Sequence, residues 1–382
     1  MDSGAPSLAM VWDQLTDHLQ VLWAALTALA IVLVLTPAVG SAARYLRLVE
    51  RRSEGERSRR SIPRFGGLAL FLGMFVPGLA FLPLGGELRG VLLGAAVATT
   101  VGAVDDFRGL RWWQKLGGQV AAAAIPTGFG VYLHTFTFFS GRQVVPAWIG
   151  VTVTVIGIVA VMNMVNFLDG LDGLAAGVCA ISGGTFCVIE LSLGRIGAAV
   201  LAAIVCGSCV GFLRHNFYPA RIFMGDSGAL LLGYTLAAVS VQGLLKTAAL
   251  ATLVLPLLVL AVPVLDTSFV VAKRIRSGQP IYLADARHLH HRFLRIGFSQ
   301  RRAVLHLWAW CATLAFAALA THFAPPRHHG DWTVVNIAID AGAAVLAAAF
   351  SLYVVYLLEL VKLSSLRRRN GARSEQQVRR SA

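Results

Sequence analysis

Long apolar stretches that recur from one end of the sequence to the other constrain this fold more than any other feature. Hydrophobic residues make up 57% of the chain and charged residues only 14%, a more apolar balance than soluble domains show. An α-helix needs about 17 to 25 mostly apolar residues to cross the hydrocarbon core of a bilayer. Eleven such stretches can be counted, at 20–40, 65–84, 88–104, 115–133, 148–164, 173–190, 196–213, 228–244, 247–271, 303–323 and 334–361. The sequence therefore predicts an all-α integral membrane protein with about eleven transmembrane helices.

The basic residues predict the orientation of these helices, because Lys and Arg in short loops are retained on the cytoplasmic side. If the N-terminus lies outside, 28 of the 33 basic residues fall in inward loops or the C-terminal tail, and five fall outside. We therefore expect the N-terminus outside and the C-terminus in the cytoplasm. Residues 1–361 are expected to form one polytopic domain, and 362–382 a basic, disordered tail. Contact with anionic lipid accounts for the net charge of +14, so no nucleic-acid partner is expected.

Five groups of polar residues lie in the inward loops or at the helix ends beside them. The first surrounds Arg64, between Pro63 and a pair of glycines. Either this segment is a turn that enters a closely packed helix, or Arg64 binds a phosphate. The second is Asp105-Asp106 at the end of the third stretch, followed by Lys115.

Two carboxylates at a helix C-terminus face the negative end of the helix dipole, so local stability does not explain Asp105 and Asp106. Adjacent carboxylates can share a divalent cation, or one can serve as base or nucleophile while the other stays ionised. The alternative is a solvated turn.

The third group closes the fifth stretch and opens the sixth. Asn163, Asn166, Asp169 and Asp172 are spaced three apart, so consecutive members are neighbours on a helical surface. Polar residues in such number at the membrane border usually face a cavity and a ligand. The alternative is that the Asp-Gly pairs simply end the helix.

The fourth group runs from Asn216 to Gly228 and includes Phe223 and Asp226. Glycines on both sides of an acid at a helix start suit backbone N–H groups that face a phosphate, with the carboxylate holding its metal. Phe223 is expected either to stack on a base or to pack in the membrane.

The fifth group lies in the longest inward loop and comprises His288, His290, His291 and Arg292. Three imidazoles beside arginines can bind phosphate or donate protons near neutral pH. A zinc site is the alternative, because His-x-His is a common metal-binding pair.

Together these five groups resemble the polyprenyl-phosphate N-acetylhexosamine-1-phosphate transferases, glycosyltransferase family 4. The resemblance runs from about residue 57 to residue 304, with the motifs in matching order. It implies ten or eleven transmembrane helices, a cytoplasmic active site and dependence on Mg²⁺, with Mn²⁺ as a possible substitute. The implied reaction transfers a hexosamine 1-phosphate from a UDP-sugar to polyprenyl phosphate (undecaprenyl or decaprenyl) and releases UMP.

The histidine motif resembles the bacterial branch that begins O-antigen, teichoic acid and related cell-wall polymers. That branch implies GlcNAc as the sugar and the bacterial inner membrane as the location, and the family suggests a homodimer.

The resemblance, together with the motifs themselves, also implies residue roles. Asp105 is expected to act as base or nucleophile beside Asp106, and Asp226 to hold the metal with help from Asp169 or Asp106. The expected substrate-binding residues are Arg64, Lys115, Asn163, Asn166, Asp169, Asp172, Asn216, Phe223, His288, His290, His291 and Arg292.

The chain departs from the family at two places. It has Ala229 where the family usually has Ser, so a hydroxyl there is not essential in this chain. It has Gly55, Glu56 and Ser58 where the family often has an Arg-Lys-x-His run, so no role is transferred to that loop.

Two rival functions stay open. A sister transferase could use another UDP-sugar, such as UDP-MurNAc-pentapeptide. A transporter of an anionic lipid or nucleotide would also place charges in a membrane cavity, although the polar clusters here gather on one side.

Overall fold

The structure is a computed structural model that describes residues 7–47, 49–51, 61–83, 85–138, 141–243, 259–276, 289–324, 327–328 and 331–381. Its helices are α1 (Leu8–Asp17), α2 (Gln20–Tyr45), α3 (Gly66–Phe81), α4 (Gly86–Arg108), α5 (Trp112–Gly128), α6 (Ala147–Leu168), α7 (Leu174–Ser192), α8 (Ile196–Asn216), α9 (Gly225–Gln242), α11 (Ala261–Arg276), α12 (Leu289–Arg295), α13 (Gln300–Phe323) and α14 (Val334–Ser381). Three antiparallel strand pairs connect some of them: β1 (Val49–Arg51) with β2 (Ser61–Pro63), β3 (Thr135–Phe138) with β4 (Gly141–Val144), and β5 (Arg327–His328) with β6 (Asp331–Trp332).

The predicted apolar stretches coincide with helices. Within the described residues, seven helices are long and apolar enough to cross a membrane: α2, α4, α6, α7, α8, α13 and the Val334–Leu357 part of α14. The other predicted stretches fall on the shorter α3 and α5, on α9, and on α11, whose predicted stretch begins within 244–258, outside the described residues. The chain is thus a mostly helical, multi-pass membrane protein, whereas the count of eleven crossings and the orientation of the termini stay predictions.

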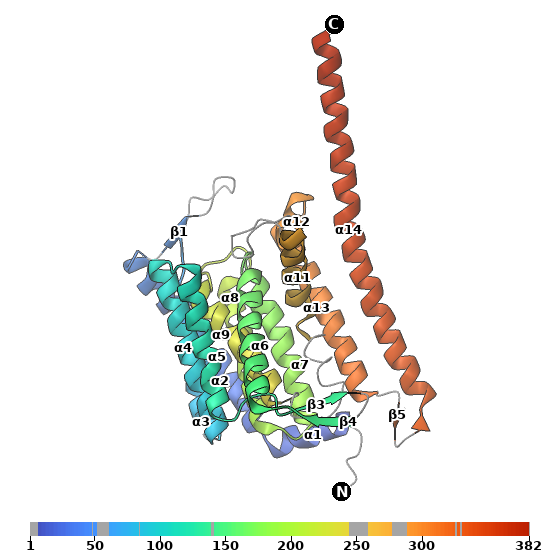
Figure 1. Cartoon of the computed structure of the whole chain (residues 1–382). Helices are drawn as coiled ribbons and strands as arrows, with labels where there is room; N and C mark the ends of the chain where they lie inside the picture. The colour runs from blue at the N-terminus through green and yellow to red at the C-terminus, as the bar shows by residue number, and fades with distance from the viewer. Residues whose placement is uncertain are drawn as a thin grey trace.

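Helices α8 and α9 form the centre of the bundle (Figure 1). Helix α9 is buried along nearly its whole length and packs against α4 and α6, while α8 packs against α2 and α7. Small residues make the closest approaches possible, as in many membrane bundles. A Cβ atom on Gly207 or Gly211 of α8 would collide with the backbone carbonyl of Ala25 or Leu29 on α2.

Helix α14 packs on α13 and then extends away from the bundle (Figure 1). Its backbone is helical to Ser381, so the segment for which the sequence predicts disorder is helical at 362–381. The physical reason is composition, because Arg, Lys, Gln and Glu in this segment are good helix formers even where charge opposes burial. The division of the chain into one membrane domain and a separate tail stays a prediction.

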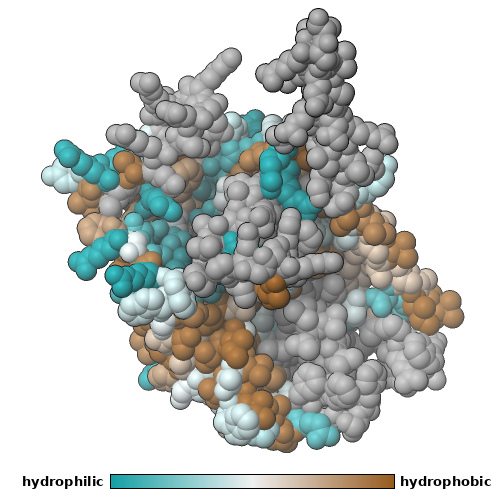
Figure 2. Space-filling view, turned by 45° about the horizontal axis from the view of Figure 1, so that its top comes forward, coloured by the Kyte–Doolittle hydropathy of each residue, from teal (hydrophilic) through white to brown (hydrophobic). Residues whose placement is uncertain are grey.

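The described surface changes character along the bundle. Figure 2 shows hydrophilic residues gathered toward the end that carries β1, with hydrophobic residues below them along the side. This change is expected where a helix bundle leaves the hydrocarbon layer. The polar groups predicted from the sequence lie on elements that converge at that end.

Candidate active site

The site is built where the segment that enters α3 pairs with the segment that enters α9. Phe223 donates its N–H to the Pro63 carbonyl at 2.9 Å, and Gly66 donates to the Phe223 carbonyl at 2.9 Å. Gly67 then donates to the Met224 carbonyl at 2.8 Å. The first and fourth predicted groups are therefore adjacent, which brings exposed Arg64 beside half-buried Phe223.

Glycine is required at this junction for steric reasons. A Cβ on Gly66 would lie 2.5 Å from the Phe212 ring, and one on Gly67 would collide with the backbone nitrogen of Gly228. The paired glycines thus let the starts of α3 and α9 touch.

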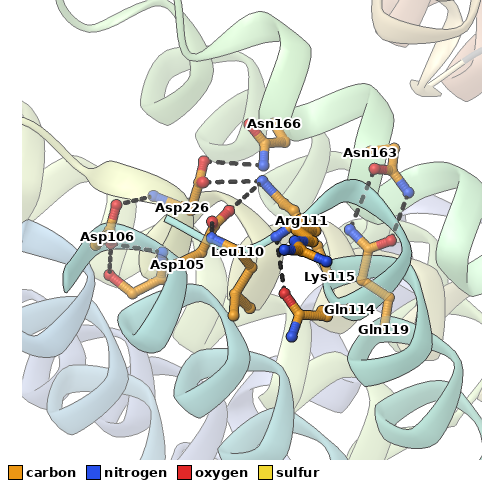
Figure 3. A network of polar contacts seen from close by, with 11 residues as sticks. Asp105, Asp106, Leu110, Arg111, Gln114, Lys115, Gln119, Asn163, Asn166 and Asp226 are labelled. Carbon is orange, nitrogen blue, oxygen red and sulfur yellow. Dashed lines mark hydrogen bonds and ion pairs between the residues drawn. The ribbon is translucent and has the colours of Figure 1, made fainter. Parts of the chain in front are cut away.

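Asp226, in the first turn of α9, is the hub of the site (Figure 3). One carboxylate oxygen accepts a hydrogen bond from Lys115 Nζ of α5 at 2.8 Å, and the other accepts from Asn166 Nδ2 of α6 at 3.0 Å. Lys115 Nζ also lies 2.9 Å from Asp105 Oδ2 of α4. Four helices therefore supply one charge-linked cluster, which brings together members of the second, third and fourth predicted groups.

Asp105 and Asp106 point to different partners. Asp105 faces Lys115 and accepts the Leu110 N–H at 2.6 Å. Asp106 instead accepts the backbone N–H of Asp226 at 2.8 Å, the N–H of Ser227 at 3.0 Å and the Ser227 hydroxyl at 2.8 Å. The two carboxylates do not converge on one point, because successive residues of a helix project about 100° apart.

Asn163 lies one helical turn from Asn166 and pairs with Gln119 of α5. Gln119 Nε2 donates to Asn163 Oδ1 at 3.1 Å, and Asn163 Nδ2 donates to Gln119 Oε1 at 2.9 Å. Gln119 is buried and is absent from the residues that the sequence predicts. Its only sequence signal is its position four residues after Lys115, on the same face of a mostly apolar helix.

Asp172 and Asn216 are buried and bind backbone groups of nearby loops. Asp172 accepts the Ala220 N–H at 2.9 Å. Asn216 accepts the Gly173 N–H at 3.0 Å and donates to the Ile222 carbonyl at 2.9 Å. These contacts join the α6–α7 junction to the loop that leads into α9, so both residues shape the site that the sequence predicts them to line.

Asp169 follows the last residue of α6 and differs from its neighbours. Its carboxylate makes no hydrogen bond to any residue that the structure describes. Burial, and then the nearby carboxylates of Asp226 and Asp106, raise the pKa of Asp169 well above its usual value. A cation bound among these groups would relieve that repulsion.

The donor set fits a magnesium ion that is held partly by substrate. Among the described residues, no three His, Cys, Asp or Glu side chains form a complete metal cage. Mg²⁺ in phosphate-transfer sites is usually held by one or two carboxylates, with water and phosphate oxygens completing the shell. Asp226 and Asp169 could supply those carboxylates.

The histidine group lies partly outside the described residues. His288 lies outside the described residues, and His290 and His291 belong to α12, where only their backbone is described. Arg292 of α12 is half-buried. Contact of these residues with a substrate stays a prediction.

Comparison with known proteins shows the family of the chain. Residues 88–244 match the family model described as glycosyl transferase family 4. The chain is 36% identical to the "Probable undecaprenyl-phosphate N-acetylglucosaminyl 1-phosphate transferase" of Bacillus subtilis over 293 residues. These residues make up 76% of this chain and 82% of that protein. The chain belongs to glycosyltransferase family 4, the polyprenyl-phosphate hexosamine-1-phosphate transferases.

Two other relatives mark the breadth of glycosyltransferase family 4. The "Decaprenyl-phosphate N-acetylglucosaminephosphotransferase" of Mycobacterium leprae is 36% identical over 352 residues, 84% of this chain and 88% of that protein. The "Phospho-N-acetylmuramoyl-pentapeptide-transferase" of Desulforudis audaxviator is 35% identical over 335 residues, 78% of this chain and 97% of that protein. The family model spans the helices that carry Asp105, Lys115, Asn166 and Asp226, so the charge-linked cluster lies in the part of the chain that defines the family.

Proposed function

We propose that this protein transfers N-acetylglucosamine 1-phosphate from UDP-GlcNAc to polyprenyl phosphate and releases UMP, with Mg²⁺ at the site. The observation that carries the proposal is the bridge formed by Lys115 between Asp105 and Asp226, at 2.9 and 2.8 Å. Joining two phosphorylated substrates is mainly a problem of negative charge, which cationic side chains and a metal solve. The bridge places a cation between two carboxylates at the end of the bundle.

The proposed reaction is an in-line displacement at the β-phosphorus of the UDP-sugar. An oxygen of polyprenyl phosphate forms the new P–O bond, and the bond from the β-phosphorus to the bridging oxygen breaks, so UMP leaves. A bound Mg²⁺ would supply charge neutralisation on the pyrophosphate, held by Asp226 and Asp169. Lys115 would leave Asp226 to contact a phosphate, while Asn166 keeps the Asp226 carboxylate oriented.

Asp105 is the proposed base. Its ion pair with Lys115 and its bond from the Leu110 N–H favour the ionised carboxylate, which could accept the proton of polyprenyl phosphate. A two-step route with Asp105 as nucleophile uses the same residues and would form a covalent phosphoryl-enzyme intermediate. Trapping that intermediate with labelled UDP-GlcNAc, in the absence of the lipid acceptor, distinguishes the two routes.

The direct test uses purified protein with UDP-GlcNAc, polyprenyl phosphate and Mg²⁺. We expect UMP release by the wild type and its near-complete loss in Asp105→Asn and Asp226→Asn. Asp13→Asn, which removes an exposed carboxylate on α1, is the matched control and should keep the wild-type rate. Near wild-type UMP release by either site variant would refute the role assigned to that residue.

A second donor has specific support, because the muramoyl-pentapeptide transferase from Desulforudis audaxviator is 35% identical to this chain. A panel of UDP-sugars that includes UDP-MurNAc-pentapeptide decides between the donors, since only the true donor should give rapid UMP release. Passage of substrate across proteoliposomes without UMP release would favour the transporter instead.

The setting of the reaction is part of the proposal. We place the active site on the cytoplasmic face of a bacterial inner membrane, feeding cell-wall polymer or O-antigen synthesis, in a chain that could form homodimers. Cysteine substitutions at Arg108 and Arg142, labelled from outside in intact cells, test the sidedness. Only the Arg142 position, on the hairpin of β3 and β4, should react.

A further inference from the structure

The geometry points to a positioning role for Asp106: it holds the first turn of α9, and thereby Asp226, rather than binding metal or substrate itself. Helix α9 has no side-chain cap of its own, because its N-cap residue is Met224. The first N–H groups of a helix need acceptors from elsewhere when they are buried. Asp106 supplies both acceptor atoms from α4, a helix more than a hundred residues earlier in the chain.

The carboxylate of Asp106 is largely occupied by these bonds. Its Oδ1 accepts the Asp226 N–H, and its Oδ2 accepts both the N–H and the hydroxyl of Ser227. A carboxylate has about four lone-pair sites, so three of them already serve the start of α9. Metal ligation through Oδ2 would compete with this cap, and a single lone-pair site stays open, on Oδ1.

The contact surface around the cap is shaped for close approach. A Cβ on Gly225 would lie 2.6 Å from Asp106 Oδ2, and Gly225 has a positive φ of 73°. A Cβ on Gly102, one turn before Asp106, would lie 2.5 Å from the Ser227 nitrogen. Glycine at both positions lets α4 and the start of α9 meet at hydrogen-bonding distance.

The consequence for the site is a division of labour between neighbours in sequence. Asp105 faces Lys115 and the reacting groups, whereas Asp106 fixes the backbone nitrogen of the residue whose carboxylate is the hub. An error of about 1 Å in the place of a catalytic group can cost about 100-fold in rate. Loss of the cap should therefore lower the rate even though Asp106 touches no substrate. The role in catalysis rests on the proposed function, but the cap itself does not.

The test measures hydrogen–deuterium exchange of the backbone at 225–228, in detergent-solubilised full-length protein. We expect exchange at Asp226 and Ser227 to accelerate about 10- to 100-fold in Asp106→Ala, because charge-assisted hydrogen bonds are lost. Asp106→Asn keeps one acceptor oxygen but places an NH₂ group against the Ser227 donors, so its acceleration should be intermediate. Asp105→Asn, the matched carboxylate on the same helix, should leave this exchange unchanged.

A milder variant covers the case in which Asp106 variants fail to fold. Ser227→Ala removes only the hydroxyl bond, so exchange should rise by about 2- to 5-fold. Its kcat for UMP release should fall while KM for both substrates stays constant. A general loss of folded protein would also lower the apparent kcat, but it would accelerate exchange in every helix and not at 225–228 alone.

The outcomes separate the two proposals. Unchanged exchange at 225–228 in folded Asp106→Ala, together with lost UMP release, would show that Asp106 acts directly in the chemistry and would overturn the inference. Another outcome is that exchange at 225–228 rises most in Asp106→Ala, less in Asp106→Asn and not at all in Asp105→Asn, while the wild type releases no UMP from any UDP-sugar. In that case the cap stands and the proposed function fails.

Discussion

Lys115 Nζ lies 2.8 Å from Asp226 Oδ2, although 111 positions separate the two residues in sequence. The same nitrogen lies 2.9 Å from Asp105 Oδ2. One ammonium group thus balances two carboxylates on two other helices, in a region where the side chain of Lys115 keeps only 21% of its exposure. Partial burial strengthens such an interaction relative to one at the open surface.

Replacing Lys115 by Met should therefore abolish most of the activity. The substitution removes the cation while keeping much of the side-chain volume, and leaves Asp105 and Asp226 facing each other without neutralisation. Losing one such charge-stabilising group usually costs about 10²- to 10³-fold in rate. UMP release measured at saturating substrate checks this. The rate of Lys115→Arg should lie between those of the wild type and Lys115→Met, because a planar guanidinium keeps the charge but not the geometry. A rate within a factor of three of wild type for Lys115→Met would contradict a catalytic role.

Gln119 and Asn163 should show strong energetic coupling. Asn163→Ala leaves the buried Gln119 amide without this partner, and Gln119→Ala leaves half-buried Asn163 with only its bond to the Val159 carbonyl. A buried polar group that loses its partner usually costs about 1–3 kcal/mol. The double substitution leaves neither amide unpaired, so its loss should be smaller than the sum by about 1 kcal/mol or more. Unfolding by denaturant in detergent micelles provides the measurement.

The control for this cycle combines Gln119→Ala with Thr152→Ala. Thr152 is exposed on α6, and among the described residues its hydroxyl bonds only to the carbonyl of Trp148 within its own helix. The losses in unfolding free energy from Gln119→Ala and Thr152→Ala should add. Equal coupling in this cycle and in the cycle of Gln119 with Asn163 would rule out a specific amide pair.

The sequence predicts the helices well because their signal is local. Apolar length alone locates α2 and α4 to within a few residues, and the turns between them follow from glycine, proline and charge. The same reasoning locates the polar groups at the helix ends. Through the family resemblance it also assigns Asp226, Lys115 and Asn166 to one site, and the structure places these three side chains in contact.

The partners of individual side chains lie beyond local pattern. Asp105 and Asp106 are identical in type and adjacent, yet one faces an ammonium group and the other faces backbone N–H groups. Likewise, polar residues at the membrane border suggest ligands, whereas Asn216 satisfies the N–H of Gly173 and the carbonyl of Ile222. Irregular backbone at membrane depth needs such partners as much as a substrate does. Only the packing of distant helices determines whether a given polar residue binds backbone groups or faces a substrate.

Gly102→Ala should move α4 away from the start of α9 while leaving most of the fold intact. The added Cβ would lie 2.5 Å from the Asp226 carbonyl oxygen, so α4 and α9 must move apart where Asp106 caps α9. A displacement of about 1 Å should lower the rate by about 100-fold. Gly117→Ala on α5 is the matched control, because its Cβ meets nothing within 4 Å. That variant should keep its activity and gain up to about 1 kcal/mol of stability from lower backbone entropy in the unfolded chain. Similar rates for the two variants would contradict a steric requirement at Gly102.

Removal of divalent cations should stop UMP release, and added Mg²⁺ or Mn²⁺ should restore it. The argument rests on Asp169, whose carboxylate lies near those of Asp226 and Asp106 and has no hydrogen-bond donor among the described residues. If Asp169 helps to hold the metal, Asp169→Asn should raise the Mg²⁺ concentration for half-maximal rate by about 10-fold or more, because one of only two proposed protein ligands loses its charge. The same titration on Asp13→Asn controls for the loss of a carboxylate elsewhere and should match the wild type.

Direct Mn²⁺ binding, followed by electron paramagnetic resonance, gives a readout that does not depend on turnover. An unchanged Mn²⁺ affinity in Asp169→Asn would leave Asp226 as the sole carboxylate ligand and assign Asp169 to the substrate instead.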